Sequence, residues 1–153
     1  MAIKTIPNDI IAEQSVLGAM FLSPLAIEKA TDKLFAKSFY LEKHNIIFQS
    51  IIDLHDRKVP IDVTTVTAEL NKNNKLNDIG GVEYLVELTN LVPSAVNVEH
   101  YIQIVEDNYM LRSVIDTSTE IATLAYDHNG EVADILDQVE SKIVGIIRNS
   151  RSS

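Results

Sequence analysis

The residues of this sequence with the greatest capacity for acid–base or metal chemistry are four histidines, and their spacing matches no catalytic motif. They are His44, His55, His100 and His128. A di-metal site in a helical bundle needs a glutamate three residues before a histidine, but leucine, isoleucine, asparagine and alanine occupy those positions. We therefore interpret the histidines as capping or surface residues rather than metal ligands.

The glycines likewise give no nucleotide-binding phosphate loop. None of Gly18, Gly80, Gly81, Gly130 and Gly145 belongs to a Gly-x-x-x-x-Gly-Lys-Ser/Thr sequence. The chain also has no nucleophile elbow and no cysteine, which excludes disulfide bonds and thiol chemistry. An enzyme would need a pocket with perturbed titratable groups, and no spacing indicates one. We expect this chain to bind no cofactor and no metal.

The length and composition predict one ordinary domain, or a head with an appendage. Of the 153 residues, 46% are hydrophobic, enough for a core that buries roughly two-thirds of the unfolded surface. No run approaches the ~20 apolar residues of a membrane span. The opening residues, Met1 to Lys4, lack the apolar segment of a signal peptide. We therefore expect a cytoplasmic protein without membrane contact.

Negative charge is concentrated in the last third of the chain. The formal net charge is −9, and residues 98–148 contain ten acidic and three basic residues, a net of −7. Binding to a phosphate backbone requires clustered lysine and arginine. We therefore expect no direct nucleic-acid binding; if the protein works on DNA, something attached to it must hold the DNA.

The same last third is predicted to form two helices folded against each other. The first carries a seven-residue apolar pattern typical of helix contact at Ile104, Leu111, Ile115, Ala122 and Ala125. Asp127 to Gly130 then form a turn, because Asn-Gly tolerates positive φ. The second run contains Val132, Leu136, Val139, Ile143 and Ile146 and extends to Arg148. At 1.5 Å per residue the helices are about 45 Å and about 25 Å long.

Residues 1–97 are predicted to form a head of about five short helices, at about 9–22, 25–34, 41–55, 63–71 and 82–90. Suitable N-terminal caps are Asn8, Ser23 before Pro24, Asp62, and Asn97 for the hairpin. In the first helix we expect Ile11, Val16, Ala19 and Leu22 to face the core, with Gly18 allowing close approach of a neighbour.

The segments between these helices are predicted to lack strands, so the fold class is all-α. Residues 58–61 are expected to be extended around Pro60, and residues 71–81 to form a surface loop. The resulting divisions are a helical head (1–97), a long antiparallel hairpin (98–148) and the start of a linker (149–153).

The first hairpin helix is apolar on more than one side, and one short partner helix cannot cover it. The surplus must meet the rest of the chain or another copy, and a two-fold contact buries the same patch on both copies. We expect this oligomer interface to contain Ile104, Leu111, Ile115, Ile121, Ala122, Val139 and Ile143. The alternative is that these residues only hold the hairpin together.

Several motifs, taken in order, resemble one family. Ile11 to Ala19 is similar to the opening signature of the N-terminal domain of bacterial and phage replicative DNA helicases of the DnaB family. Later blocks match in the same order: Phe39-Tyr40 with His44, Ile47 and Phe48; Pro60-Ile61-Asp62 with Thr65, Val66 and Leu70; Gly80-Gly81 with Tyr84 and Leu85; and Pro93-Ser94 with Asn97, Tyr101 and Leu111-Arg112. The resemblance covers about residues 7–148.

The resemblance implies a helical head and hairpin that pair as dimers, three of which form a collar on a ring of motor domains. It also implies docking of the helicase-binding domain of primase and, in some systems, of a helicase loader. ATP hydrolysis with Mg²⁺ and DNA translocation belong to the family's motor domain. We therefore expect this chain to be a non-catalytic part of a helicase, with the linker to the motor beginning at Asn149.

The positions that match the family's primase-docking surface are Tyr84, Ile115, Ile121 and Ile11. An exposed tyrosine suits such a contact because its ring buries area with little loss of entropy. Alternatively, Tyr84 is a core residue whose hydroxyl reaches the surface. A stand-alone helical adaptor or inhibitor that docks on a helicase or loader is the alternative to a helicase domain.

Overall fold

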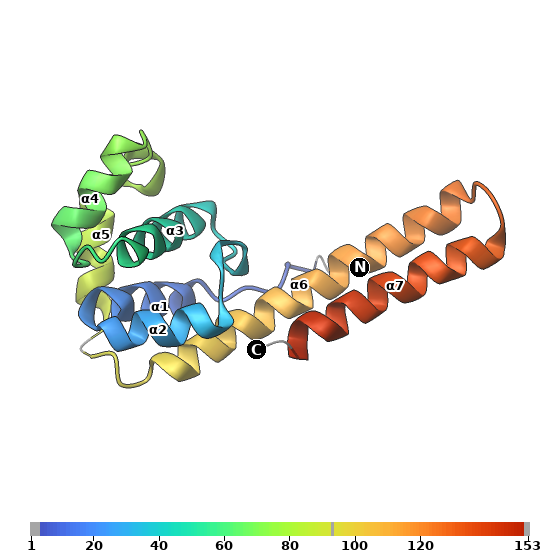
Figure 1. Cartoon of the computed structure of the whole chain (residues 1–153), viewed down its shortest axis with the longest axis horizontal. Coiled ribbons are helices and arrows are strands. Elements are labelled where there is room, and N and C mark those ends of the chain that lie inside the picture. The colour runs from blue at the N-terminus through green and yellow to red at the C-terminus, as the bar shows by residue number, and fades with distance from the viewer. Residues whose placement is uncertain (1–3, 93, 152–153) are drawn as a thin grey trace. The chain divides into compact units, whose positions relative to one another are not determined.

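The computed structural model of the chain describes residues 4–92 and 94–151, and the regular structure within them is entirely helical. This confirms the predicted all-α class. In chain order the helices are α1 (Ile10–Leu22), α2 (Pro24–Lys33), α3 (Glu42–Asp56), α4 (Val63–Lys72), α5 (Gly81–Leu91), α6 (Val98–Asp127) and α7 (Val132–Arg151) (Figure 1). Short 3₁₀ helices lie at Ala36–Ser38 and Asn77–Ile79.

The chain divides into two compact units at a different place from the sequence-based boundary. Asn8–Asp107 forms one unit, which we call the head, and residues 108–151 form the other together with residues 4–7. The first ten residues of α6 thus belong to the head, because Val98, Ile102 and Val105 are buried in its core. The sequence-based boundary between residues 97 and 98 lies at the start of α6, whereas the observed boundary lies inside this helix, between Asp107 and Asn108.

The head is built around α1, which packs against α2, α3 and α5. Gly18 permits the approach to α5, since a Cβ there would collide with the carbonyl oxygen of Leu88. The largest fully buried side chains come from six α-helices and one 3₁₀ helix and include Leu17, Met20, Ile27, Ile47, Phe48, Ile51, Leu70, Ile79, Leu85, Leu88 and Ile102. This core fixes how α1, α3 and α5 face one another.

Most of the predicted helix starts are confirmed. Ser23 caps α2 with Pro24 in its first turn, and Asp62 caps α4 in a reciprocal capping box with Thr65. The cap of α1 is Asp9 rather than the expected Asn8, since the Asp9 carboxylate accepts from the backbone N–H of Ala12 at 2.9 Å. Both side chains can cap, and the helix begins one residue later than predicted.

The prediction that Ile11 and Leu22 face the core was wrong, whereas Val16 and Ala19 are buried as expected. Ile11 is 71% exposed although the next two residues, Ala12 and Glu13, are buried, so Ile11 lies on the outer face of α1. Leu22 ends α1 and lines an open surface groove beside Pro24 and Val59.

Two helices end on non-glycine residues with positive φ, which the sequence did not reveal. Lys58 (φ 60°) follows α3, and Asn74 (φ 58°) follows α4. After α3, Lys58 N–H bonds to the carbonyl of His55 and Val59 N–H to that of Leu54, each at 2.9 Å, the pattern of a Schellman motif. The expectation that Lys58 is extended was therefore wrong. The loop of residues 71–81 also differs from a simple surface loop, because its 3₁₀ helix buries Ile79.

The second unit is the antiparallel hairpin of α6, from Asn108, and α7 (Figure 1). Its helices are linked by an ion pair at 3.6 Å between Glu120 and Lys142. α6 ends at Asp127, and Gly130 adopts φ 94° in the turn, as Asn-Gly predicted. α7 continues to Arg151, so residues 149–151 of the expected linker are still helical, and its residues 152–153 lie outside the described residues. No helix in the described ranges is long and apolar enough to span a membrane.

Candidate functional site

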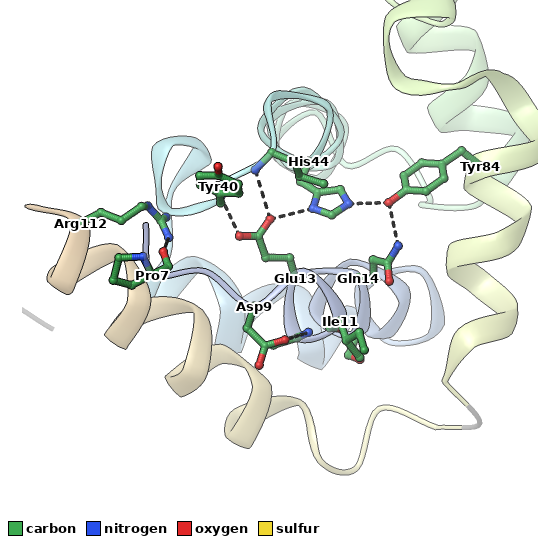
Figure 2. Close-up of polar contacts among 12 residues, drawn as sticks. Pro7, Asp9, Ile11, Glu13, Gln14, Tyr40, His44, Tyr84 and Arg112 are labelled. Carbon is green, nitrogen blue, oxygen red and sulfur yellow. Dashed lines mark hydrogen bonds and ion pairs between the residues drawn. The ribbon is translucent and has the colours of Figure 1, made fainter. Parts of the chain in front are cut away.

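A buried chain of polar side chains joins α1, α3 and α5 in the head. It consists of Glu13, His44, Tyr84 and Gln14, and we call it the buried relay (Figure 2). His44 is fully buried and Glu13 is only 1% exposed. Because buried polar groups are costly when unpaired, this cluster must be fully hydrogen-bonded to be compatible with the surrounding core.

Glu13 acts as a cap for a helix other than its own. The N-terminal cap position of α3 is Leu41, whose side chain cannot accept a hydrogen bond. The Glu13 carboxylate accepts instead from the backbone N–H of Tyr40 at 2.7 Å and, at 3.5 Å, from that of Leu41. It also contacts His44 Nδ1 at 2.8 Å. A buried carboxylate is stabilised by such N–H groups and by the positive end of a helix.

The other ring nitrogen of His44 leads to α5. Nε2 lies 2.5 Å from the hydroxyl oxygen of Tyr84, which also accepts from the Gln14 amide at 3.1 Å. The His44 and Tyr84 rings are nearly parallel, with centroids 5.9 Å apart, and the Lys43 ammonium lies 3.9 Å from the centroid of the tyrosine ring. Burial raises the pKa of Tyr84, because the phenolate is poorly solvated there, so this group stays an O–H donor at neutral pH.

These contacts bear on two sequence-based expectations. Tyr84 is only 8% exposed, which agrees with the alternative that it is a core residue, and its hydroxyl bonds to His44. His44 is neither a surface residue nor a helix cap, because α3 places it against α1 and α5. Glu13 and His44 could have been found as polar residues at helical spacing among apolar ones: Glu13 precedes Val16 and Leu17, and His44 precedes Ile47 and Phe48.

The relay does not resemble a catalytic site. Its groups are bonded to one another, and the residues that line the head's two described surface cavities do not include Glu13, His44 or Tyr84. Within residues 4–92 and 94–151, no group of three histidine, cysteine or carboxylate side chains is placed to hold a metal ion. The arrangement orients side chains and supports helix packing.

In the hairpin, the predicted interface residues fall into two sets. Half-buried side chains line the seam between α6 and α7, including Ile121 and Val139. Leu111, Ile115 and Ile143 are instead 52%, 43% and 45% exposed, and Ala122 is also exposed. The structure thus assigns part of the pattern to holding the hairpin together and leaves the rest on the surface. Ile104 belongs to the head, where it is partly buried against the core.

The exposed apolar residues of the hairpin form one stripe on each helix. On α6 the stripe includes Leu111, Val114, Ile115, Ala122 and Tyr126, with the polar Ser118 among them; on α7 it includes Val132, Leu136, Ile143, Val144 and Ile147, with Glu140 among them. Members of each stripe are three or four residues from seam residues, as Leu136 and Ile143 are from Val139, so stripe and seam are neighbours on the helix surface. The apolar surface of the hairpin therefore continues beyond what its two helices cover.

Comparison with known proteins identifies a family that matches this chain. A family model described as "DnaB-like helicase N terminal domain" matches residues 5–107. The chain belongs to this family. This confirms the resemblance seen in the sequence motifs, and the matched range ends where the head ends.

Full-length members of the DnaB-like family are similar to the chain over most of its length. Replicative DNA helicase DnaB of Geobacillus stearothermophilus is 43% identical over 146 residues, which are 95% of this chain and 32% of that protein. Replicative DNA helicase DnaC of Bacillus subtilis is 40% identical over 147 residues, 96% of this chain and 32% of that protein. The chain thus spans about a third of the length of these curated relatives.

Solved structures of the DnaB-like family share the fold. The N-terminal domain of DnaB helicase from Mycobacterium tuberculosis matches with a TM-score of 0.88 and 37% identity, over 93% of this chain and 99% of that one. A DnaB-like replicative helicase, solved in a study of its interactions with primase, matches with a TM-score of 0.75 and 25% identity, over 90% of this chain and 31% of that one. The head and hairpin are therefore the architecture of this family's N-terminal domain.

Proposed function

We propose that this chain is a non-catalytic collar domain of a replicative DNA helicase, which self-associates through its hairpin and docks primase. Family membership supports the helicase context. The observation that carries the self-association is the exposed apolar stripe on both hairpin helices. The catalytic motor, with ATP and Mg²⁺, lies in a part of the helicase outside this sequence.

The stripe suits a second copy of the same hairpin. Two antiparallel hairpins that face each other with these stripes form a four-helix arrangement, and a two-fold axis lets each stripe cover its counterpart. Contiguous exposed apolar area of this kind usually marks an interface. We place Leu111, Ile115, Ala122 and Ile143 at the contact, with Ile121 and Val139 supporting it from the seam. In a longer chain, dimers of this kind would assemble three to a ring.

Light scattering over a wide concentration range tests this proposal. The unchanged chain is expected to form dimers or larger closed assemblies, and Leu111→Lys is expected to shift it to monomer, since it buries a charge in the contact. Thr123→Lys adds the same charge at an exposed position of α6 outside the stripe and should leave the assembly intact. A chain that stays monomeric at high concentration contradicts the hairpin interface.

Docking of the helicase-binding domain of primase is the second part of the proposal. The candidates are the exposed residues Ile11 on α1 of the head and Ile115 on the hairpin, with half-buried Ile121 on the same hairpin helix. The similar DnaB-like helicase solved in the study of its interactions with primase supports this partner class. A helicase loader is a further partner that the same collar would meet during assembly.

Calorimetric titration of the chain with the helicase-binding domain of primase tests docking. Ile11→Glu is expected to weaken binding, because it places an unpaired charge in an apolar contact, whereas Leu25→Glu alters another exposed apolar residue, on α2, and should not. Unchanged affinity for Ile11→Glu removes that residue from the contact. A coding sequence that continues past Ser153 into a phosphate-loop motor supports the helicase context, and one that stops there favours an adaptor or inhibitor.

A further inference from the structure

With the Gln14 amide donating to Tyr84, as it does in the structure, one placement of the protons gives every donor of the buried relay an acceptor. The Glu13 carboxylate only accepts, and it already receives the N–H groups of Tyr40 and Leu41. His44 Nδ1 points at the same carboxylate at 2.8 Å and must therefore carry a proton. If Nδ1 were bare, two acceptors would face each other in the core, at the cost of an unmade buried hydrogen bond.

The second nitrogen of His44 must then be unprotonated. The Tyr84 hydroxyl has one proton to donate, and among the described residues its oxygen bonds only to His44 and to the Gln14 amide. The Gln14 amide donates there in the structure, and in that orientation the tyrosine proton is accepted by an unprotonated Nε2. In an imidazolium form, Nε2–H and Gln14 would both donate to Tyr84 and leave its own proton without an acceptor.

The relay ends in residues that reach the surface. Gln14 and Lys43 are both partly exposed, the first bonded to the Tyr84 hydroxyl and the second lying over its ring. Ile11, one turn before Gln14 on α1, is the most exposed apolar residue of that helix. A fully buried histidine is thus connected through Tyr84 to side chains in the surface layer of the head.

We propose that His44 is a positioning residue: neutral and protonated on Nδ1, it fixes Tyr84 and, through it, Gln14 and Lys43 as a rigid surface on which the helicase-binding domain of primase docks. The docking part of this proposal rests on the proposed function. Tyr84 then serves docking through the position of its hydroxyl and ring, and His44, which is completely buried, serves it without touching the partner.

Nitrogen-15 NMR of the imidazole tests the proton arrangement directly, with or without a partner. At neutral pH the full chain is expected to show, for His44, one protonated nitrogen at Nδ1 and one bare nitrogen at Nε2. Tyr84→Phe removes only the hydroxyl and should shift the Nε2 resonance, whereas Tyr126→Phe, the same change at a tyrosine 84% exposed in the hairpin, should not. Two protonated nitrogens, or an Nε2 signal indifferent to Tyr84→Phe, overturn the relay.

Binding to the helicase-binding domain of primase tests the positioning role. Tyr84→Phe and His44→Leu are each expected to weaken binding about tenfold, and the double variant should be no weaker than the worse single one, since both break one relay. His44→Gln, which can replace one of the two hydrogen bonds, should recover part of the loss. Additive losses, or an effect of Tyr84→Phe without one of His44→Leu, would mean direct contact and overturn positioning.

The NMR measurement and the binding measurement together distinguish failure of this proposal from failure of the proposed function. If the unchanged chain does not bind the primase domain at all, the docking function fails and the positioning role fails with it. The NMR result then decides the proton arrangement alone. Circular dichroism on each variant checks that helicity is unchanged, and Tyr84→Phe carries the test if His44→Leu does not fold.

Discussion

At the scale of single residues, the head depends on a carboxylate in an unusual place. Glu13 lies on the buried side of α1 and replaces the missing side-chain cap of α3. The helix that it caps lies about 30 residues later in the chain, so propensity and local capping rules could not predict the contact. The sequence motif around Glu13 indicated a family, whereas only the fold shows why a charged residue belongs at this position.

Glu13→Gln is expected to destabilise the head by about 2–3 kcal/mol, because its NH₂ group would face backbone N–H groups and leave buried donors unpaired. Urea unfolding followed by circular dichroism measures the change. The matched control is Glu28→Gln on the exposed surface of α2, which should stay within about 0.5 kcal/mol of the unchanged chain. Equal stabilities of the two variants would contradict the capping role of Glu13.

A second residue-scale feature is the positive φ of Lys58. Lys58→Gly is expected to stabilise the chain by about 0.5–1 kcal/mol, because glycine adopts that conformation without a steric penalty. Thermal unfolding measures the shift. Lys58→Ala removes the same side chain but keeps the Cβ, so it should not give this gain; if it does, the effect comes from the lysine side chain and not from the backbone.

At the scale of helices, the sequence predicted the existence and type of every α-helix, because apolar residues recur at helical spacing and caps such as Ser23 and Asp62 are strong local signals. The sequence-based prediction failed where tertiary contacts determine which side chains are buried. Ile11 has the spacing of a core residue but is 71% exposed, and Ile79 in a polar loop is buried in the core. The two hairpin stripes share one apolar pattern, so spacing alone could not separate seam from surface.

The closeness of α1 and α5 gives a prediction with a built-in control. Gly18→Ala is expected to destabilise the head by about 1–3 kcal/mol, since the new Cβ would collide with the backbone of Leu88 and push the helices apart. At Gly145 on α7 an added Cβ meets nothing within 4 Å, so Gly145→Ala should stabilise by about 0.5–1 kcal/mol through helix propensity. Urea unfolding of both variants checks the opposite signs.

The ends of α3 and α4 are joined by an ion pair, with Arg57 Nη2 and Glu69 Oε1 2.8 Å apart. The hydrogen bond from Arg57 lowers the pKa of Glu69. A lowered folded-state pKa gives stability that is present above the unfolded-state pKa and lost as pH falls through the folded one. Arg57→Gln is therefore expected to lower the melting temperature at neutral pH, with a difference that shrinks in acid.

Melting curves of Arg57→Gln and the unchanged chain from neutral to acid pH measure this difference. Lys37→Gln removes an exposed charge on the 3₁₀ helix after α2 and should show little dependence on pH relative to the unchanged chain. A constant difference across the pH range for Arg57→Gln would assign the effect to side-chain packing instead of the ion pair.

At the scale of the whole molecule, the negative charge of the hairpin opposes self-association, whereas its exposed apolar area favours self-association. Residues 98–148 carry a net charge of −7, and the hairpin helices within them carry the exposed apolar stripes proposed for self-association. Charge repulsion between two such hairpins is screened by salt, whose Debye length falls from about 30 Å at 0.01 M to about 8 Å at 0.15 M.

Self-association is therefore expected to tighten as salt is added between those two concentrations. Sedimentation equilibrium at both salt concentrations gives the two dissociation constants. The variant Leu111→Lys, which is expected to be monomeric, is the control. A salt-dependent change in its measured molar mass would come from contacts other than the stripe. Weaker association at higher salt would mean that ion pairs across the interface outweigh the repulsion.

The buried relay also limits how this sequence can change over generations. Its members lie 31, 40 and 70 residues apart along the chain and on three helices, yet each satisfies a group on another. Replacing any one of them leaves a buried donor or acceptor without a partner, at a cost of about 1–3 kcal/mol. A set of apolar replacements would fit the same space, but single substitutions reach it only through destabilised intermediates. Glu13, His44 and Tyr84 should therefore be inherited and lost together, as a covarying group among related sequences.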